Sequence, residues 1–337
     1  MSHELYFYVN AEDRPVRRGL FGPLKTMGNP EDIPKDDLLA FLQSNDRFTY
    51  PVTTDDGFIV LYRNKHTGTE VTFKFHSGTI HEVESRFSFP GYNYTGLSVS
   101  IEYFRPAYFV VETAPLIVAM CQRFHMFILD PQLSPMLRKC MASTIIRSWE
   151  IGNEKAINTA RDNDPYPTVE QEAGANRTSR PFIPRDKLMI WWKYSLRKEE
   201  LKKRVRSTAA GVYVPEWKVI RRISDKRLFF AITLAEGMGY IMPKCEAFLV
   251  KRNRFTEVGV VHSDVLLPTI QEYLKPWTFS GIDFSVLTSP DARRISKILA
   301  ELELESLEEY EQIAPGSFVD VPGPLAQEWP SALDHRR

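Results

Sequence analysis

The sequence predicts an α+β protein made of two domains. Strand-like and helix-like segments are mixed along the 337 residues, without the regular alternation that marks a doubly wound parallel sheet. A chain of this length exceeds one typical hydrophobic core. Three prolines and little apolar periodicity indicate a linker or mobile loop at 164–183. We therefore expect an N-terminal domain at 1–163 and a C-terminal domain at 184–337, with largely antiparallel or mixed sheets.

The first domain begins with a strand-like segment and a hairpin. Residues 4–9 are rich in aromatic and branched side chains, as strands are, and Pro34 precedes a short apolar helix. The segments 58–62 and 70–75 flank a turn that contains Gly68, and the second segment alternates apolar and polar residues. This pattern predicts two antiparallel strands joined by a short loop.

A βαβ-like unit is expected next. Residues 96–104 alternate in the manner of a half-buried strand, Arg105 and Pro106 interrupt it, and 107–124 form an apolar helical segment. A short buried strand at 126–129 follows, and we expect it to pair in parallel with the strand at 96–104. Ser134 and Pro135 then predict the cap and first turn of a long helix that ends the domain near residue 162.

The second domain is predicted to open with a helix at 185–206. The strands, helices and tail expected after it are strands at 211–220, 227–234, 247–251 and 258–262, a helix at 264–274 closed by Pro276, an alternating strand at 278–287, a helix at 290–304 and an acidic, proline-containing tail.

Charge is distributed unevenly along the chain. Arg177 to Arg227 contains 16 Lys and Arg but only 5 Asp and Glu, although the whole chain carries 43 of each. Three of the six tryptophans, among them Trp191 and Trp192, also lie in this tract. Such segregation produces a directed field, which steers partners more than it stabilises a fold.

On the predicted helix 185–206, the apolar and basic side chains fall on different faces. Ile190, Tyr194, Leu201 and Val205 share one face by helical spacing, which leaves the cations to solvent. Glu199 and Glu200 each precede a base by four residues, as in a simple solvated helix with internal ion pairs and buried tryptophans. The alternative is a basic-aromatic docking surface. The residues predicted for it are Trp191, Trp192, Arg197, Lys198, Lys202, Lys203, Arg204 and Arg206.

An acidic protein, a nucleic acid and an acidic membrane surface all fit such a surface. Trp and Arg are enriched at protein interfaces, whereas Lys and Arg with an exposed Trp also suit phosphates and unpaired bases. No nucleic-acid motif accompanies the charge. The acidic segment from Glu301 to Glu311 could also cover the basic helix within the fold.

Catalytic or cofactor motifs are weak in this sequence. It contains no glycine-rich nucleotide fingerprint and no metal-ligand spacing, so no cofactor and no metal are predicted. The His76 to Glu82 segment and His262-Ser263-Asp264 contain suitable residue types, but a strand surface and a helix cap explain them more simply. Cys121, with His125 one helical turn later, has apolar neighbours typical of a packed thiol. Arg105 follows a strand at the end where open sheets bind ligands, so it is a ligand candidate.

The sequence therefore favours a non-catalytic, cytoplasmic protein that binds a macromolecule. No segment has the length and apolarity of a membrane span, no signal-peptide pattern opens the chain, and three scattered cysteines suit reduced thiols. An adaptor, a regulator or a toxin-neutralising, immunity-like protein would use the basic-aromatic surface to dock an acidic protein. The alternatives are an enzyme whose site is assembled from scattered residues and a nucleic-acid-binding protein.

Overall fold

The computed structural model describes residues 1–11, 18–19, 22–23, 35–76, 83, 86–163, 180–208, 211–252 and 256–321. Its helices and several mixed and antiparallel sheets confirm the α+β class. The chain forms two compact units, Met1–Phe182 with Phe318–Asp320, and a second that begins at Ile183. Most of the predicted linker, 164–179, lies outside the described residues. The return of Phe318–Asp320 to the first unit was not expected from the sequence.

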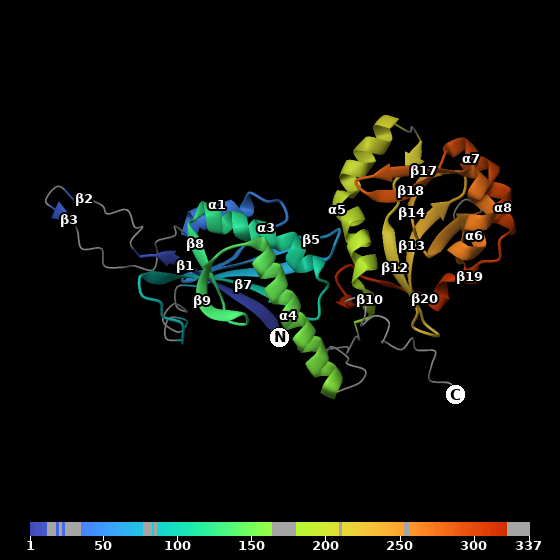
Figure 1. Cartoon of the computed structure of the whole chain (residues 1–337). Coiled ribbons are helices and arrows are strands. Elements are labelled where there is room, and N and C mark those ends of the chain that lie inside the picture. Colours follow the sequence, from blue (N-terminus) through green and yellow to red (C-terminus); the bar gives the residue numbers. More distant parts are fainter. Residues whose placement is uncertain are drawn as a thin grey trace. The chain divides into compact units, whose positions relative to one another are not determined.

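The first unit is built on a seven-stranded sheet in the order β4-β5-β6-β7-β1-β8-β9. In the part of the unit that the structure describes, helices α1, α3 and α4 accompany this sheet (Figure 1). The face of the sheet that packs against these helices carries the buried residues Leu5, Phe73 and Val99. Along their strands, these residues alternate with more exposed ones. The bounds are β1 Ser2–Asn10, β4 Val52–Thr54, β5 Gly57–Asn64, β6 Thr69–His76, β7 Tyr92–Glu102, β8 Met126–Asp130, β9 Ser134–Lys139, α1 Lys35–Gln43, α3 Tyr108–Arg123 and α4 Ala142–Asn163. The short β2 Arg18–Gly19 and β3 Gly22–Pro23 pair with each other.

The expected parallel pairing of the βαβ-like unit is wrong. β7, α3 and β8 follow one another as predicted, but β1 lies between β7 and β8 and pairs antiparallel with both. The two outer strands are therefore parallel without touching, which makes the unit a split βαβ arrangement. The amino-terminal strand occupies the gap because its buried residues Leu5 and Phe7 complete the core between β7 and β8.

The long helix after β8 begins later than predicted. Ser134–Lys139 forms the edge strand β9, which pairs with β8 through Phe127 and Ile128, and α4 starts at Ala142. A proline is tolerated in an edge strand because its missing N–H costs no ladder hydrogen bond on the solvent side. Pro135 therefore marks a sheet edge here and not a helix start.

A buried carboxylate fastens the β5–β6 hairpin to α3. The side chain of Glu112 is only 2% exposed. It accepts hydrogen bonds from Tyr62 at 2.8 Å, from Asn64 at 2.5 Å and from Thr67 and Thr69 at 3.0 Å each. Buried polar groups are stable only when they are bonded in this way, so the network fixes the hairpin turn against the helix.

The second unit contains a four-stranded sheet in the order β11-β14-β18-β17 and a six-stranded sheet in the order β19-β16-β15-β13-β12-β20 (Figure 1). Its strands are β11 Val212–Tyr213, β12 Trp217–Arg222, β13 Leu228–Ala235, β14 Gly239–Pro243, β15 Ala247–Arg252, β16 Glu257–His262, β17 Leu274–Phe279, β18 Ile282–Leu287, β19 Glu305–Ser306 and β20 Tyr310–Ile313. Its helices are α5 Arg185–Thr208, α6 Ser263–Ile270, α7 Ser289–Arg294 and α8 Ser296–Glu301, with short 3₁₀ turns η3 Gln271–Tyr273 and η4 Leu307–Glu309; β10 Phe182–Pro184 and β21 Val319–Val321 pair separately.

Four predictions for this unit need correction. The segment 211–220 is not one strand but two, β11 and β12, which belong to different sheets. The segment 278–287 is not one strand but part of the β17–β18 hairpin, whose turn residues Ser280 and Gly281 have φ of 49° and 75°. Positive φ at both central positions matches the twist of a tight hairpin. Pro276, predicted to end a helix, lies on the edge strand β17. The helix expected at 290–304 is two short helices, α7 and α8.

Candidate docking surface on the basic helix

Helix α5 is anchored to the second unit by aromatic side chains. The Trp191 indole donates a hydrogen bond to the carbonyl of Trp217 at 2.7 Å, and the Tyr194 hydroxyl donates to the carbonyl of Pro215. The Tyr194 ring also packs against those of Trp217 and Phe284, with centroids 5.4 and 6.1 Å apart. This face of the helix is therefore fixed by both directed bonds and apolar burial.

The aromatic part of the predicted surface is wrong for Trp191 and Trp192. Their side chains are only 2% and 8% exposed, so neither offers a ring to a partner in this structure. The physical reason is the position of both indoles on the buried side of α5, where a large apolar ring is stabilised by leaving water. Leu188, Leu201 and Val205 share that side.

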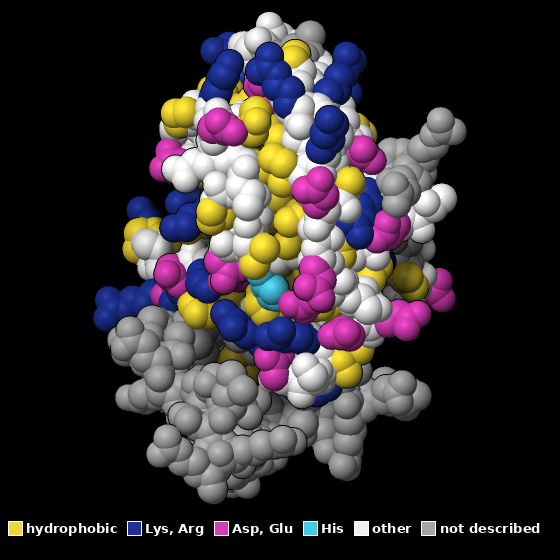
Figure 2. Space-filling view, turned by 90° about the vertical axis from the view of Figure 1, so that its right-hand side faces the viewer, with side chains coloured by type: hydrophobic (Ala, Val, Ile, Leu, Met, Phe, Trp, Pro, Cys, Tyr) yellow, Lys and Arg dark blue, Asp and Glu magenta, His cyan; other side chains and the backbone are white. Residues whose placement is uncertain are grey.

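The cations of α5 lie on its outer side. Lys193, Arg197, Lys203, Arg204 and Arg206 are exposed, and Lys198 and Lys202 are partly buried. We call these seven residues the basic face. The helix as a whole carries nine Lys and Arg against three Asp and Glu. Figure 2 shows the opposite side of the second unit, that of α6–α8, where Lys and Arg are interspersed with Asp and Glu and with apolar side chains.

The end of the basic face is not neutralised by ion pairs. Glu199 pairs with Lys202 at 2.6 Å, whereas the expected bonds from Glu199 to Lys203 and from Glu200 to Arg204 are not formed. Among the residues that the structure describes, Lys203, Arg204 and Arg206 have no ion-pair partner. Three cations at the carboxyl end of a helix also complement the helix dipole, which helps to explain how they are tolerated so close together.

The pKa of Lys198 is affected by the other positive charges near this face. Burial lowers the pKa of Lys198, and the charges of Lys202 and Lys218 lower it further, against the opposing effects of Glu216 and Glu199. Lys218 comes from β12, so the positive cluster extends from the helix to the neighbouring strand. An anion placed there would stabilise the charged form of Lys198.

The acidic segment covers the strand part of the basic tract and leaves the helix part open. Arg221 bonds to Glu311 at 2.5 Å across the β12–β20 pairing, and Arg222 lies 2.9 Å from Asp225 and 3.8 Å from Glu305. The acidic segment was expected to cover the basic helix, but its ion pairs are instead to β12. No ion pair between the Glu301–Glu311 segment and α5 occurs among the described residues.

A half-buried aromatic pair that the sequence analysis missed lies beside α5. Trp277 and Phe279 stack nearly parallel on β17, with ring centroids 5.9 Å apart. Trp277 also contacts Phe284, which contacts Tyr194 of the helix. The alternation of aromatic residues at 277 and 279 was a usable signal, because residues two apart on a strand share a face.

Arg105, the ligand candidate, lies just after β7. Its guanidinium bonds to Glu102 at 2.6 and 2.8 Å and lies 5.6 Å from the centre of the Phe109 ring. Burial lowers the pKa of Arg180, and the nearby charge of Arg105 lowers it further. The two arginines are therefore neighbours, but Arg105 is already paired with a carboxylate, and its role as a ligand contact remains a prediction.

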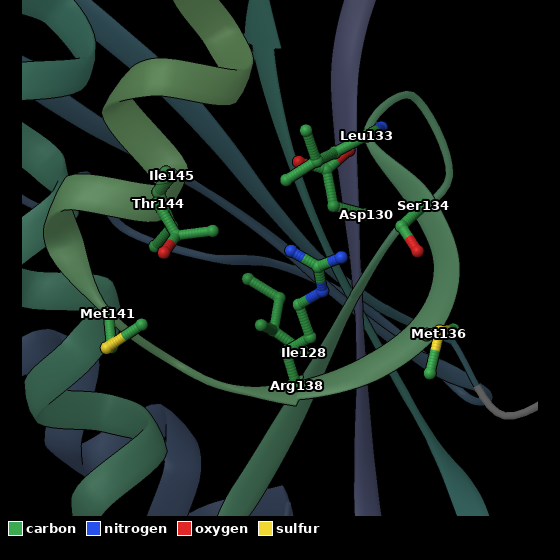
Figure 3. A pocket seen from close by; sticks show the side chains of 9 residues that line it. All are labelled: Ile128, Asp130, Leu133, Ser134, Met136, Arg138, Met141, Thr144 and Ile145. Carbon is green, nitrogen blue, oxygen red and sulfur yellow. The ribbon is translucent and has the colours of Figure 1, made fainter.

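One buried cluster of catalytic residue types has no room for a substrate. His3 is fully buried, with its Nε2 3.2 Å from Asp130 and its Nδ1 3.3 Å from the Tyr103 hydroxyl. The hollow beside Asp130 measures about 10 Å³, and the Arg138 side chain points into it (Figure 3). Such a volume holds at most about one water molecule. The hollow beside Asp130 is therefore too small for a substrate.

The other motifs considered for chemistry are placed as follows. A hydrogen bond to Cys140 raises the pKa of Cys121, and burial raises it further. Burial raises the pKa of Cys245 to about 12, and both shifts oppose thiolate formation. His262 lies 3.3 Å from Glu305 and from the Tyr310 hydroxyl. His76 ends β6, while His81 and Glu82 lie outside the described residues. Within the described part of the chain, no three metal-type ligands gather and no helix could span a membrane.

Comparisons with known proteins give no further guidance. No family model, no curated protein and no solved structure matches this chain.

Proposed function

We propose that this protein is a non-catalytic binding protein that docks an acidic protein partner on the basic face of α5. The observation that supports this proposal most strongly is that Lys203, Arg204 and Arg206 are exposed and lack an ion-pair partner among the described residues. Complementary charge steers encounter and sets specificity. Three free cysteines are in keeping with a reducing compartment such as the cytoplasm, where an adaptor, regulator or toxin-neutralising protein would act.

A protein partner is favoured over nucleic acid by three features. The tryptophans of α5 are buried, so the helix lacks a platform on which unpaired bases would stack. The arginines of β12 are paired with Glu311 and Asp225, which shortens the basic stripe that a phosphate backbone would follow. The half-buried rings of Trp277 and Phe279 on β17 add apolar aromatic area to the second unit, of a kind enriched at protein interfaces.

The proposal is tested by removing the three cations together. A tagged variant with Lys203→Gln, Arg204→Gln and Arg206→Gln is compared with the parent chain in pull-downs from extract of the source cell, with and without nuclease treatment, at low and high salt. Glutamine removes the charges without placing acids at the helix end, so the variant keeps a helix-compatible sequence. Exposed pairs contribute about 0.2–1 kcal/mol each, so we expect about 3- to 150-fold weaker binding.

The control carries the same loss of charge elsewhere on the second unit. Lys244, Arg293 and Lys297 are exposed on β14–β15, α7 and α8, and their replacement by Gln should leave capture unchanged. A stoichiometric acidic protein that is retained by the control and lost by the α5 variant supports the proposal. Equal capture by both variants contradicts it, and loss of the bound material after nuclease treatment assigns the face to nucleic acid.

A further inference from the structure

The sheet of the first unit has a hollow on the face opposite the buried residues that pack with its helices. Its volume is about 230 Å³. It lies over the three central strands β6, β7 and β1. The side chains that line it are Glu4, Tyr6, Thr72, Lys74, Val83, Arg86, Phe87, Tyr94, Ser98 and Ser100. None of these residues belongs to the basic face of α5, so the hollow is a separate feature.

The strand register produces the hollow. Thr72 is paired with Ser100, and Lys74 with Ser98, across β6 and β7. Ser98 and Ser100 are in turn paired with Tyr6 and Glu4 of β1. Because paired residues share a face of the sheet, three small hydroxyl side chains form the floor and larger side chains stand around them.

One rim of the hollow is basic, and its floor consists of hydrogen-bonding groups. Among the residues that the structure describes, the ammonium group of Lys74 and the hydroxyls of Thr72, Ser98 and Ser100 have no protein partner. Arg86 adds a second positive charge at the hollow. Ammonium and hydroxyl groups donate to carboxylate or phosphate oxygens, and bonds to a charged acceptor are about twice as strong as neutral ones.

The opposite wall is aromatic and is held in place. The Tyr6 ring lies 6.2 Å from Phe87 and 6.0 Å from Tyr94. The Tyr8 hydroxyl donates to the carbonyl of Phe87 at 3.0 Å and so fixes this segment over the sheet. Glu4 accepts a hydrogen bond from the Tyr6 hydroxyl at 2.9 Å, which orients its carboxylate beside the rings.

We propose that this hollow binds a small organic anion that carries a ring. The acidic group, a carboxylate or a phosphate, would lie by Lys74 and the hydroxyls of the floor, and the ring would lie against Tyr6 and Phe87. Glu4 would accept a hydrogen bond from a hydroxyl or amino group on the far side of the ring. The volume is below the roughly 300–1,000 Å³ of drug-sized sites, so the ligand is a small metabolite and not a polymer.

The test is calorimetric titration of the full chain with four probes. Phenyl phosphate and benzoate combine a ring with the two kinds of acid, inorganic phosphate lacks the ring, and benzyl alcohol lacks the charge. We expect at least one ring-bearing acid to bind at about millimolar concentration or below, and the other two probes to bind at least about tenfold more weakly. The tighter of phenyl phosphate and benzoate identifies the acidic group.

Two variants and one control connect binding to the hollow. Lys74→Gln removes the cation, and we expect it to weaken binding by about tenfold or more. Ser98→Leu fills the floor and should abolish binding even if the cation is intact. Lys65→Gln, in the exposed turn between β5 and β6, should bind as the parent chain does.

Two results would overturn the inference. One is the absence of heat with both ring-bearing acids up to about 10 mM, well above the expected dissociation constant. The other is binding that survives both Lys74→Gln and Ser98→Leu, or that Lys65→Gln weakens equally. Since none of these residues lies on α5, failure here leaves the docking proposal standing, and failure of docking leaves this one.

Discussion

The replacement Glu112→Gln should destabilise the first unit. The carboxylate accepts from four side chains at 2.5–3.0 Å and lies 3.3 Å from a nitrogen of Arg47. An amide of the same shape presents NH₂ where one oxygen stood, so at least two donors lose their acceptor. Each unsatisfied buried group costs about 1–3 kcal/mol, which gives about 2–6 kcal/mol, with the low end applying if the threonine hydroxyls rotate to accept.

The assay is thermal and urea unfolding of the full chain, monitored so that the first unit's transition is resolved. A loss of 2 kcal/mol corresponds to a fall of about 4–8 °C in melting temperature for a unit of this size. The Tyr62 hydroxyl adds an independent readout. Burial raises its pKa, and the charge of Glu112 raises it further, so the pKa should fall in the variant.

The matched control is Glu70→Gln on the same hairpin. Glu70 pairs with Arg63, but both side chains are largely exposed, so the control should change stability by no more than about 0.5 kcal/mol. Equal melting of the Glu112 variant and the parent would refute the reasoning, because it would mean that the four bonds have no net effect.

The remaining predictions concern one buried pair, one partly buried lysine and one helical glycine. Burial by itself would raise the pKa of Asp130, but the hydrogen bond to His3 and the charge of His3 lower it, so the pKa in the folded protein is below the usual 3.8. The ionised Asp130 therefore contributes to the free energy of unfolding above pH 3.8, and this contribution is lost as the pH falls through the folded pKa. In urea unfolding at a series of pH values, Asp130→Asn should reduce the fall of unfolding free energy toward low pH. An unchanged pH dependence would exclude the His3–Asp130 pair as its cause. Burial lowers the pKa of Lys198, so stability should rise with pH from the folded pKa up to 10.5, and Lys198→Met should remove the rise; a rise that persists contradicts this. Gly152→Ala would place a Cβ 2.1 Å from the Tyr103 hydroxyl, so it should lower the melting temperature although alanine favours helices. Adding Tyr103→Phe, which removes that hydroxyl, should recover part of the loss. A higher melting temperature for Gly152→Ala alone would contradict this, because it would mean that the Tyr103 ring moves aside freely.

Local pattern was enough to predict most elements of the fold. The alternation of Val71, Phe73 and Phe75 marks a half-buried strand because side chains alternate across a sheet. The apolar spacing on α5 placed Tyr194, Leu201 and Val205 on its buried side, as the structure confirms, but it was wrong for Ile190, which is 48% exposed. Both signals depend only on neighbours in sequence.

What the sequence could not give depends on contacts between distant segments. The insertion of β1 between β7 and β8 pairs residues about a hundred positions apart, and no local period encodes it. The hollow likewise exists only because Ser98 of β7 lies between Lys74 and Tyr6. Tryptophan within a basic helix could face either side, and only the packing on Trp217 decides that Trp191 is buried.

The most direct measurement of the central claim is site-specific photo-crosslinking in the source cell. A photoreactive amino acid replaces Glu200, which is exposed among the cations of α5, so that every positive charge of the basic face is kept. The same residue at Asp264, exposed on α6, is the control. The proposed function predicts an adduct with one acidic protein from position 200 and none from 264. Adducts with nucleic acid, or the same proteins from both positions, would contradict it.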